Sequence, residues 1–261
     1  MFTFGADPEL FVKKDGIFQS GYGLIPGDKE NPFPVERGAV QVDGMALEFN
    51  IDPTSEEEDF VLNLETVLSQ LRLMVPDYEL VPSPVADFER AYLESQPEDA
   101  KALGCNPDYN GWTGQENTSP DASVSFRTGS GHIHIGWTKD ADINSVEHQA
   151  QAYALVRQLD FYLGLPSVIY DEDTRRRELY GKAGACRIKP YGVEYRVLSN
   201  VWLKSQDMMR WVFRSANDGV AALVGGRCLE DTYGDIQDII NTSDKDRAMF
   251  ILKDANILLP S

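Results

Sequence analysis

The stretch that decides the fold reads, from residue 131, Gly131-His132-Ile133-His134-Ile135-Gly136-Trp137. In a β-strand, successive side chains point to opposite faces of the sheet. The apolar Ile133, Ile135 and Trp137 therefore share one face. His132 and His134 share the other. A strand of this kind needs a covering layer on its apolar face and leaves two imidazoles available for chemistry on the opposite face.

Two further stretches repeat this alternation. Residues 47–51 alternate apolar side chains with Glu48, and residues 193–197 alternate them with Glu194 and Arg196. Antiparallel sheets often have a solvated polar face, but such a face is usually made of Lys, Thr, Ser and Glu, whereas these strands carry His-x-His and Glu-x-Arg. The pattern indicates a functional face.

Turn and strand signals near the N-terminus extend the sheet. Asp7 and Glu9 share a strand face, provided that the proline between them lies at a strand start or on an edge. Ala39–Ile51 predicts a β-hairpin with Asp43-Gly44 as a two-residue turn of type I′. Residues 124–137 predict one further strand, and the polar stretch 96–123 predicts a long functional or disordered loop.

Helical periodicity follows these strands. The predicted helices cover residues 55–75, 144–163, 206–224, 234–241 and 244–254, and the second of them is expected to stop at Gly164 and Pro166. We therefore expect a single α+β domain over residues 1–261. Its largely antiparallel sheet should carry helices on one face and the active site on the other.

The composition restricts the partners of the chain. A formal net charge of −18 over 261 residues disfavours nucleic acid and anionic membranes as partners. The N-terminus lacks a signal-like apolar run, and no stretch approaches the roughly 20 apolar residues of a membrane span. Cys105, Cys186 and Cys228 form no CxxC pair, so we expect reduced thiols in a cytoplasmic protein.

Carboxylates and imidazoles on one sheet face suit a divalent metal. Two carboxylates ~4 Å apart repel by roughly 4 kcal/mol at an effective dielectric constant near 20, so a cluster of them calls for cations. The alternative is a hydrogen-bonded polar network without metal.

Basic residues accompany these acids. Arg127, Arg187, Lys189 and Arg196 could bind phosphate oxygens beside a metal, which is the arrangement of phosphoryl-transfer sites. Residues 175–177 are three consecutive arginines that are equally consistent with a solvated helix end. Residues 128–131, Thr-Gly-Ser-Gly, could let a backbone approach a ligand closely, but they are not a Walker A loop. The chain contains no GxGxxG motif, which argues against a Rossmann site.

The order of these motifs resembles the glutamine synthetase and glutamate–cysteine ligase superfamily. The closer resemblance is to the phage phiEco32-like type 2 COOH–NH2 ligase (amidoligase) family. The motifs that carry it are Gly5-Ala6-Asp7-Pro8-Glu9-Leu10-Phe11, Val42-Asp43-Gly44, Glu48-Phe49-Asn50, Gly104-Cys105-Asn106-Pro107-Asp108-Tyr109-Asn110, Gly131-His132-Ile133-His134-Ile135-Gly136, and Tyr180-Gly181 through Arg187 to Glu194-Tyr195-Arg196.

The resemblance implies a glutamine synthetase-like fold and an ATP-dependent carboxylate–amine ligase that forms an amide through an acyl phosphate. It implies ATP and Mg²⁺, with Mn²⁺ as the alternative metal, and amino acid, peptide or cell-wall-type substrates in a host cytoplasm. The implied metal ligands are Glu9, Glu48, Glu194 and His132, with His134 as the alternative to His132. The implied catalytic residues are Arg187, Arg196 and Asp43, with Asp7 as the alternative base. The implied nucleotide contacts are Arg127, Ser130, His134, Lys189 and Arg196.

Two other functions remain open at this point. His-x-His also occurs in metal-dependent amidohydrolases, but those are barrels with further histidine ligands, and only His148 is left here, on a predicted helix. A non-catalytic binding protein on a ligase scaffold is the third possibility.

Overall fold

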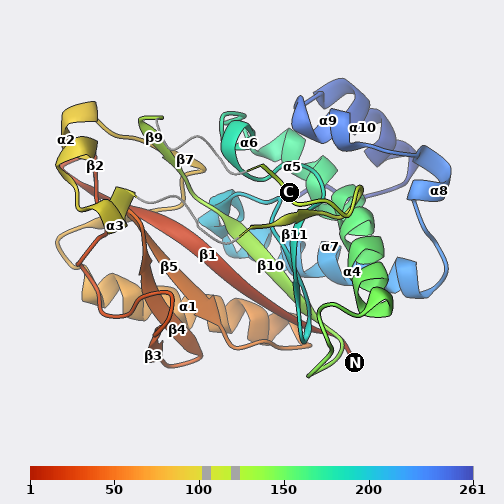
Figure 1. The fold of residues 1–261 in the computed structure, drawn as a ribbon, viewed down its shortest axis with the longest axis horizontal. Helices are drawn as coiled ribbons and strands as arrows, with labels where there is room; N and C mark the ends of the chain where they lie inside the picture. The colour runs from red at the N-terminus through yellow and green to blue at the C-terminus, as the bar shows by residue number, and fades with distance from the viewer. Residues whose placement is uncertain (102–106, 119–123, 261) are drawn as a thin grey trace.

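The computed structural model describes residues 1–101, 107–118 and 124–260 (Figure 1). The main sheet of these residues is antiparallel throughout, in the order β3-β4-β5-β1-β10-β12-β11-β8, and β2 and β6 also pair with β1. A separate two-stranded sheet joins β7 and β9. The strands are β1 Thr3–Lys14, β2 Ile17–Gln19, β3 Phe33–Val35, β4 Gly38–Asp43, β5 Ala46–Ile51, β6 Glu79–Val81, β7 Val85–Asp87, β8 Tyr109–Asn110, β9 Phe126–Thr128, β10 Gly131–Gly136, β11 Ala185–Lys189 and β12 Gly192–Tyr195.

Helices alternate with runs of strands along the chain. The α-helices are α1 Glu57–Met74, α2 Arg90–Ser95, α3 Glu98–Lys101, α4 Val146–Leu159, α5 Leu165–Tyr170, α6 Arg176–Leu179, α7 Gln206–Val224, α8 Glu230–Tyr233, α9 Gln237–Asn241 and α10 Lys245–Asp254. A π-helical turn, Asp160–Gly164, joins α4 to α5, and a 3-10 helix spans Asn200–Lys204. Within the described part of the chain, no helix is long and apolar enough to cross a membrane.

The apolar face of the sheet forms the core. On β1, Phe4, Ala6 and Leu10 alternate inward and are almost completely buried. Phe4 meets Phe213 of α7 edge-on, with 5.0 Å between ring centroids, and Phe213 in turn contacts Phe60 of α1. Each buried aromatic side chain contributes roughly 1.5–3 kcal/mol relative to exposure. The predicted covering layer is therefore present as α1, α4 and α7, which pack on this face.

One end of the opposite face is covered by apolar side chains. Phe11, two residues beyond Glu9 on β1, packs with Phe88 and Leu93 in a second, smaller apolar cluster. Helices α2 and α3 and strand β7 contribute side chains to this cluster, and they lie close to one another and to β9 in Figure 1. The rest of this face stays polar.

Two predicted elements differ in detail. The hairpin forms, but Asp43 pairs with Ala46, so the turn residues are Gly44 and Met45. Gly44 has a φ of +58° and Met45 does not have a positive φ, which fits a type II′ turn rather than type I′. The strand predicted over 124–137 breaks between β9 and β10, because β9 leaves the main sheet to pair with β7.

The helix predicted over 144–163 does not stop at Gly164 and Pro166. It passes through the π-helical turn into α5, where Pro166 lies in the first turn and its missing N–H is harmless. The turn buries Asp160, whose carboxylate accepts hydrogen bonds from Tyr195 Oη (2.7 Å) and Trp112 Nε1 (2.6 Å). Burial raises the pKa of Asp160 to about 7.

Asp160 should make stability depend on pH. Between its ordinary pKa near 4 and its folded pKa near 7, the folded chain keeps a proton that the unfolded chain has lost. Stability should therefore fall as pH rises through this window, by up to about 1.4 kcal/mol per pH unit. Asp160→Asn has no proton to lose, so the difference in unfolding free energy between the two proteins should shift in favour of the variant from pH 5 to pH 7. Urea denaturation at several pH values measures this, and parallel profiles would contradict it.

Candidate functional site

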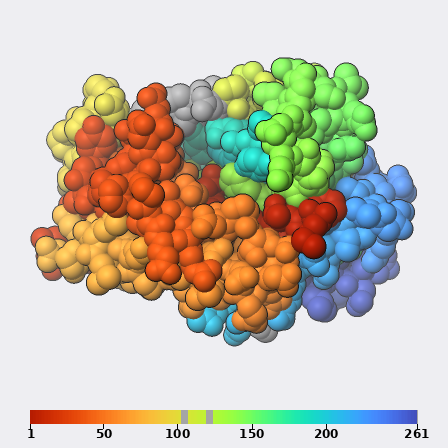
Figure 2. All heavy atoms as spheres, turned by 90° about the horizontal axis from the view of Figure 1, so that it is seen from below, coloured from red at the N-terminus to blue at the C-terminus, as the bar shows by residue number. Residues whose placement is uncertain are grey.

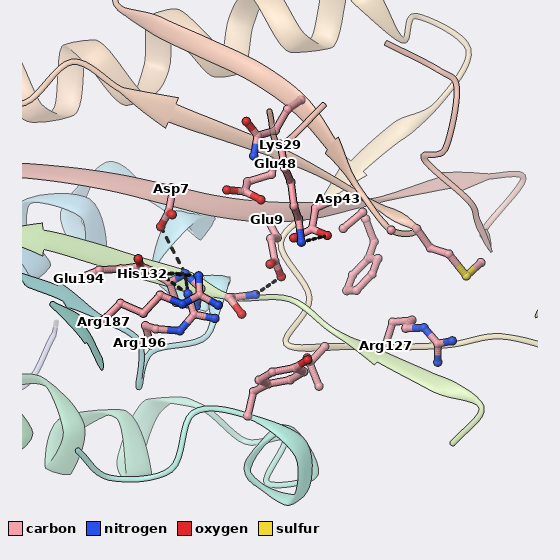
Figure 3. A pocket seen from close by; sticks show the side chains of 18 of the residues that line it. Asp7, Glu9, Lys29, Asp43, Glu48, Arg127, His132, Arg187, Glu194 and Arg196 are labelled. Atoms are coloured by element: carbon pink, nitrogen blue, oxygen red, sulfur yellow. Dashed lines mark hydrogen bonds and ion pairs between the residues drawn. The ribbon is translucent and has the colours of Figure 1, made fainter. Parts of the chain in front are cut away.

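A pocket of about 290 Å³ lies on the polar face of the sheet. Figure 2 shows the surface hollowed between the orange N-terminal segments and the green and teal segments. Side chains from β1, β4 and β5 enter it from one side and those from β10, β11 and β12 from the other, as Figure 3 shows. Every site residue predicted from the sequence lines this pocket except His134, which lies beside it in contact with Asp7.

Strand register brings these distant residues together. Glu9 of β1 pairs directly with Glu48 of β5, and Asp7 of β1 pairs with His132 of β10. On the other side of β10, Glu194 of β12 pairs with His134, one outward position along β10 from His132. The alternation predicted from the sequence is therefore confirmed, and antiparallel pairing converts it into one continuous polar surface.

Asp7, His134 and Glu194 form what we call the first acidic group, with one ligand atom of each within 4.8 Å of the others. His134 Nε2 lies 3.0 Å from Asp7 Oδ1, yet neither atom has a hydrogen-bond partner of acceptable geometry. The other ring nitrogen, Nδ1, contacts Tyr191 Oη. When Nδ1 carries the proton, Nε2 turns a lone pair towards the carboxylates, and a cation between them relieves the repulsion. This group fits a divalent metal.

The charges of the first acidic group reinforce one another. Burial raises the pKa of Asp7, but the two neighbouring histidines outweigh it and hold that pKa well below its usual range. Burial lowers the pKa of His134, but the charges of Asp7 and Glu194 outweigh it and raise the pKa. The carboxylates therefore stay ionised, and a divalent cation that binds them would replace the proton on Nε2 of His134.

Glu9, Asp43 and Glu48 form the second acidic group, again with ligand atoms within 4.8 Å. Glu9 Oε2 accepts the backbone N–H of Ser130 at 2.8 Å. Burial and then the charge of Asp43 raise the pKa of Glu9 to about 7. Burial and three neighbouring carboxylates raise the pKa of Glu48 well above its usual range. Three carboxylates here carry more negative charge than their surroundings stabilise, which also fits a divalent cation.

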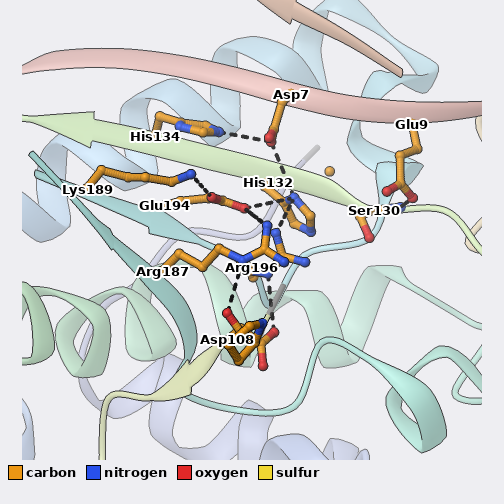
Figure 4. A network of polar contacts seen from close by, with 12 residues as sticks. Asp7, Glu9, Asp108, Ser130, His132, His134, Arg187, Lys189, Glu194 and Arg196 are labelled. Carbon is orange, nitrogen blue, oxygen red and sulfur yellow. Dashed lines mark hydrogen bonds and ion pairs between the residues drawn. The ribbon is translucent and has the colours of Figure 1, made fainter. Parts of the chain in front are cut away.

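A wall of cations faces the first acidic group (Figure 4). Arg196 Nη1 donates to Glu194 Oε1, Lys189 Nζ lies 2.9 Å from Oε2, and Arg187 Nη1 lies 3.6 Å from Oε1. Burial and Asp7 raise the pKa of Glu194, but Arg196 and then His134 and His132 outweigh them and bring that pKa to about 2. Arg196 also reaches Asp108 through Nε at 3.2 Å, so its guanidinium is held from two sides.

His132 lies between the acids and these cations. Its Nδ1 is 3.3 Å from Asp7 Oδ1, 3.5 Å from Glu194 Oε1 and 3.3 Å from Arg196 Nη1. Burial, with the charge of Arg196, lowers the pKa of His132 to about 4. A neutral ring can accept the guanidinium N–H at Nδ1, so His132 helps to hold Arg196. The structure thus places His134, rather than His132, in the group of three ligand atoms.

The other predicted nucleotide contacts are placed less directly. Arg127 lines the far end of the pocket, but its guanidinium donates to the carbonyls of Lys101, Val124 and Phe126. Ser130 lies in the pocket wall, where its backbone N–H binds Glu9. Arg127 therefore lines the pocket and also holds neighbouring backbone segments through these hydrogen bonds.

The glycine-rich segment is packed against protein. A Cβ on Gly129 would lie 2.4 Å from Asn200 Nδ2, and one on Gly131 would lie 2.3 Å from Trp202 Nε1. These glycines admit the 3-10 helix at Asn200–Lys204 close to the start of β10. The sequence predicted that this glycine backbone would approach a ligand closely. Its close neighbours are instead other residues of the chain.

The three consecutive arginines divide in role. Arg175 is exposed and pairs with Asp87 and Asp173, as a solvated helix end would. Arg176 is buried, and its guanidinium donates to Ser130 Oγ and to the carbonyl of Val197 beside the pocket. Arg177 is also buried and is remote from the pocket lining.

Sequence reasoning did not single out two pocket residues. Lys29 reaches the pocket from a loop between β2 and β3, with Nζ 2.7 Å from Asp43 Oδ1. Tyr180 also lines it, and its Oη is buried with no hydrogen-bond partner. Tyr180 belongs to one of the family motifs quoted above. Lys29 lies in a Gly- and Pro-rich stretch, and the only feature that could have marked it is its positive charge in an acidic chain.

The two histidines should differ in their effect on metal binding. His134→Ala removes a ligand atom of the first acidic group and should weaken Mn²⁺ binding at least about tenfold. His132→Ala should change Mn²⁺ affinity much less, because its Nδ1 is shared with Arg196. Calorimetric titration of the two variants measures this, with His148→Ala, a buried imidazole bound to the Lys189 carbonyl, as the control. A larger loss in His132→Ala would reverse the assignment.

Comparisons with known proteins found a structural similarity and a family-model match. Among solved structures, the chain is similar to that of a bifunctional glutathione synthetase from Pasteurella multocida, with a TM-score of 0.43 and 12% sequence identity over 97% of this chain and 46% of the other. The chain thus spans less than half the length of that protein. No curated protein matches the sequence. Residues 114–223 match the family model described as Phage phiEco32-like COOH.NH2 ligase-type 2, the family that the sequence motifs resemble.

Proposed function

We propose that this chain is an ATP- and Mg²⁺-dependent carboxylate–amine ligase with a glutamine synthetase-like active-site sheet. The observation that carries the proposal is that two groups of side chains able to ligate a metal lie in or beside one pocket, next to Arg187, Lys189 and Arg196. Acids for magnesium beside guanidinium groups for phosphate oxygens are the recurrent parts of a phosphoryl-transfer site. The family match over residues 114–223 supports the ligase class.

The two acidic groups would each bind one divalent cation. Asp7, His134 and Glu194 would hold one cation, and Glu9, Asp43 and Glu48 a second. When bound, such ions neutralise phosphate charge and orient the phosphates of ATP. In this assignment Asp7 and Asp43 would both be metal ligands. We therefore assign neither of them as the base that accepts a proton from the attacking amine.

The cations would act on the transferring group. Arg196 is held rigidly by Glu194, Asp108 and His132, so its donors are fixed before a ligand arrives. Preorganised donors of this kind typically contribute about 10²–10³ in rate each when charge develops on the transferred group. Arg187 and Lys189 would add charge at the same wall.

The reaction class requires that water be kept from the activated carboxylate. The proposed chemistry transfers the γ-phosphoryl group of ATP to a substrate carboxylate, and an amine then displaces phosphate to form the amide. Pro107 and Asp108 lie against the site, because Pro107 accepts a hydrogen bond from Arg187 Nε (3.3 Å) and Asp108 binds Arg196. Part of the loop predicted around Cys105 lies outside the described residues. The described part could exclude water from this end of the pocket.

The competing functions have less support. The main sheet of the described residues is antiparallel, with distinct terminal strands β3 and β8, whereas amidohydrolases are barrels. His148, the third histidine of the chain, bonds the carbonyl of Lys189 and does not line the pocket. A binding protein without catalysis would have little use for two acidic groups and a preorganised arginine.

Binding of MgATP should stabilise the fold. A ligand that binds only the folded state adds ~2.7 kcal/mol at a hundredfold excess over Kd, so the melting temperature should rise with ATP and Mg²⁺ together. NAD, the control, should leave it unchanged. ADP release in a screen of amino acid and peptide pairs, with and without Mg²⁺, then tests ligation. The proposal is wrong if millimolar ATP with Mg²⁺ gives neither a shift nor heat of binding.

Arg196→Lys should affect turnover much more than folding. Lysine keeps the charge but lacks the separate nitrogens with which Arg196 contacts Glu194, Asp108 and His132. We expect a melting temperature within a few degrees of wild type and turnover at least about a hundredfold slower. Arg214→Lys, on the exposed face of α7 beside Glu57, is the matched control and should keep full activity. Activity that falls only in step with the folded fraction would make Arg196 a structural residue.

A further inference from the structure

Lys29 projects into the pocket from a fixed backbone. The Asp28 carboxylate accepts two backbone N–H groups of the following turn, at 2.9 and 2.8 Å. Gly27, with a φ of +90°, accepts the backbone N–H of Val42 in β4 at 3.2 Å, and a Cβ there would collide with backbone atoms 2.6 Å away. The turn that carries Lys29 is therefore tied to the strand that carries Asp43.

The ammonium of Lys29 enters the second acidic group. Nζ lies 2.7 Å from Asp43 Oδ1, as the dashed line in Figure 3 marks. Among the residues that the structure describes, no other cation lies within ion-pair distance of Glu9, Asp43 or Glu48. The Lys29 side chain is 47% exposed, so it can leave this position without disturbing the core.

An ammonium and a divalent ion compete for this group. One oxygen of each of the three carboxylates lies within 4.8 Å of the others, and Lys29 already pairs with Oδ1 of Asp43. A divalent ion carries twice the charge and accepts several oxygen ligands at once. Its arrival would therefore displace Lys29, whose anchored backbone keeps the ammonium at the wall of the pocket.

We propose that Lys29 has two successive partners: its ammonium neutralises the second acidic group until a divalent cation binds there, and it then binds an anionic phosphate oxygen of the nucleotide. The inference rests on the proposed function, since it takes ATP with a divalent ion as the ligand. In a chain with a net charge of −18, phosphate must be bound by local cations, and the displaced Lys29 supplies one.

Lys29→Met tests both partners, because it removes the charge and keeps the length of the side chain. Mn²⁺ is titrated first into nucleotide-free protein, and the non-hydrolysable β,γ-methylene analogue of ATP is then titrated at saturating Mn²⁺. We expect Mn²⁺ to bind at least about tenfold more tightly to the variant, and the analogue at least about tenfold more weakly. A purely structural effect would weaken both.

Matched variants complete the design. Lys29→Arg keeps the charge and should return both affinities towards wild type. Lys139→Met makes the same change in net charge at an exposed position outside the pocket lining and should leave both affinities unaltered. Lys29→Gln provides a second neutral variant should Lys29→Met fold poorly.

The outcomes separate this inference from the ligase proposal. Mn²⁺ affinity that is unchanged or weaker in Lys29→Met, or analogue affinity that is unchanged, overturns the role of Lys29 and leaves the ligase proposal standing. A wild-type protein that binds Mn²⁺ but no ATP analogue overturns the proposed function itself.

Discussion

Backbone pairing of β1 on both of its sides is the constraint on which the polar face depends. Antiparallel neighbours fix β1 along its length, because β10 pairs with residues 3–8, β5 with residues 9 and 10, and β6 and β2 with residues 11–14. A slip of one residue would turn Phe4 and Leu10 towards solvent and Asp7 and Glu9 into the core, so the hydrophobic effect that holds the core also holds the site in register. Charge repulsion among the buried carboxylates works against folding, and the apolar face of the same strands offsets it.

Residues whose placement follows from local alternation could be predicted from the sequence. The shared face of Asp7, Glu9, Glu48, His132 and Glu194 needed only the period of a strand and the assumption that the strands belong to one sheet. The neighbour of each residue needed the register, which local pattern does not contain. His134 and His132 were therefore indistinguishable until β10 was paired with β1 and β12.

Features set by tertiary packing could not be predicted. Gly164 and Pro166 signal a helix end, yet a buried carboxylate at Asp160, bound by Tyr195 and Trp112, makes continuation through a π-helical turn favourable. Lys29 has no periodicity to mark it, because its position depends on how a loop closes onto β4. The break between β9 and β10 depends likewise on a partner strand, β7, some forty residues earlier.

The two acidic groups are seated on neighbouring outward positions of one strand, at Asp7 and Glu9. A rise of about 3.3–3.4 Å per residue sets their Cα atoms roughly 6.7 Å apart. Hydrogen bonding to both neighbouring strands prevents this distance from being altered without a bulge that would break the pairing. Side-chain substitutions at Asp7 and Glu9 can change which ligands these positions bind, but not the distance between their Cα atoms. The rise per residue of the strand thus fixes the spacing of the two acidic groups, and the spacing of charges along any ligand must match it.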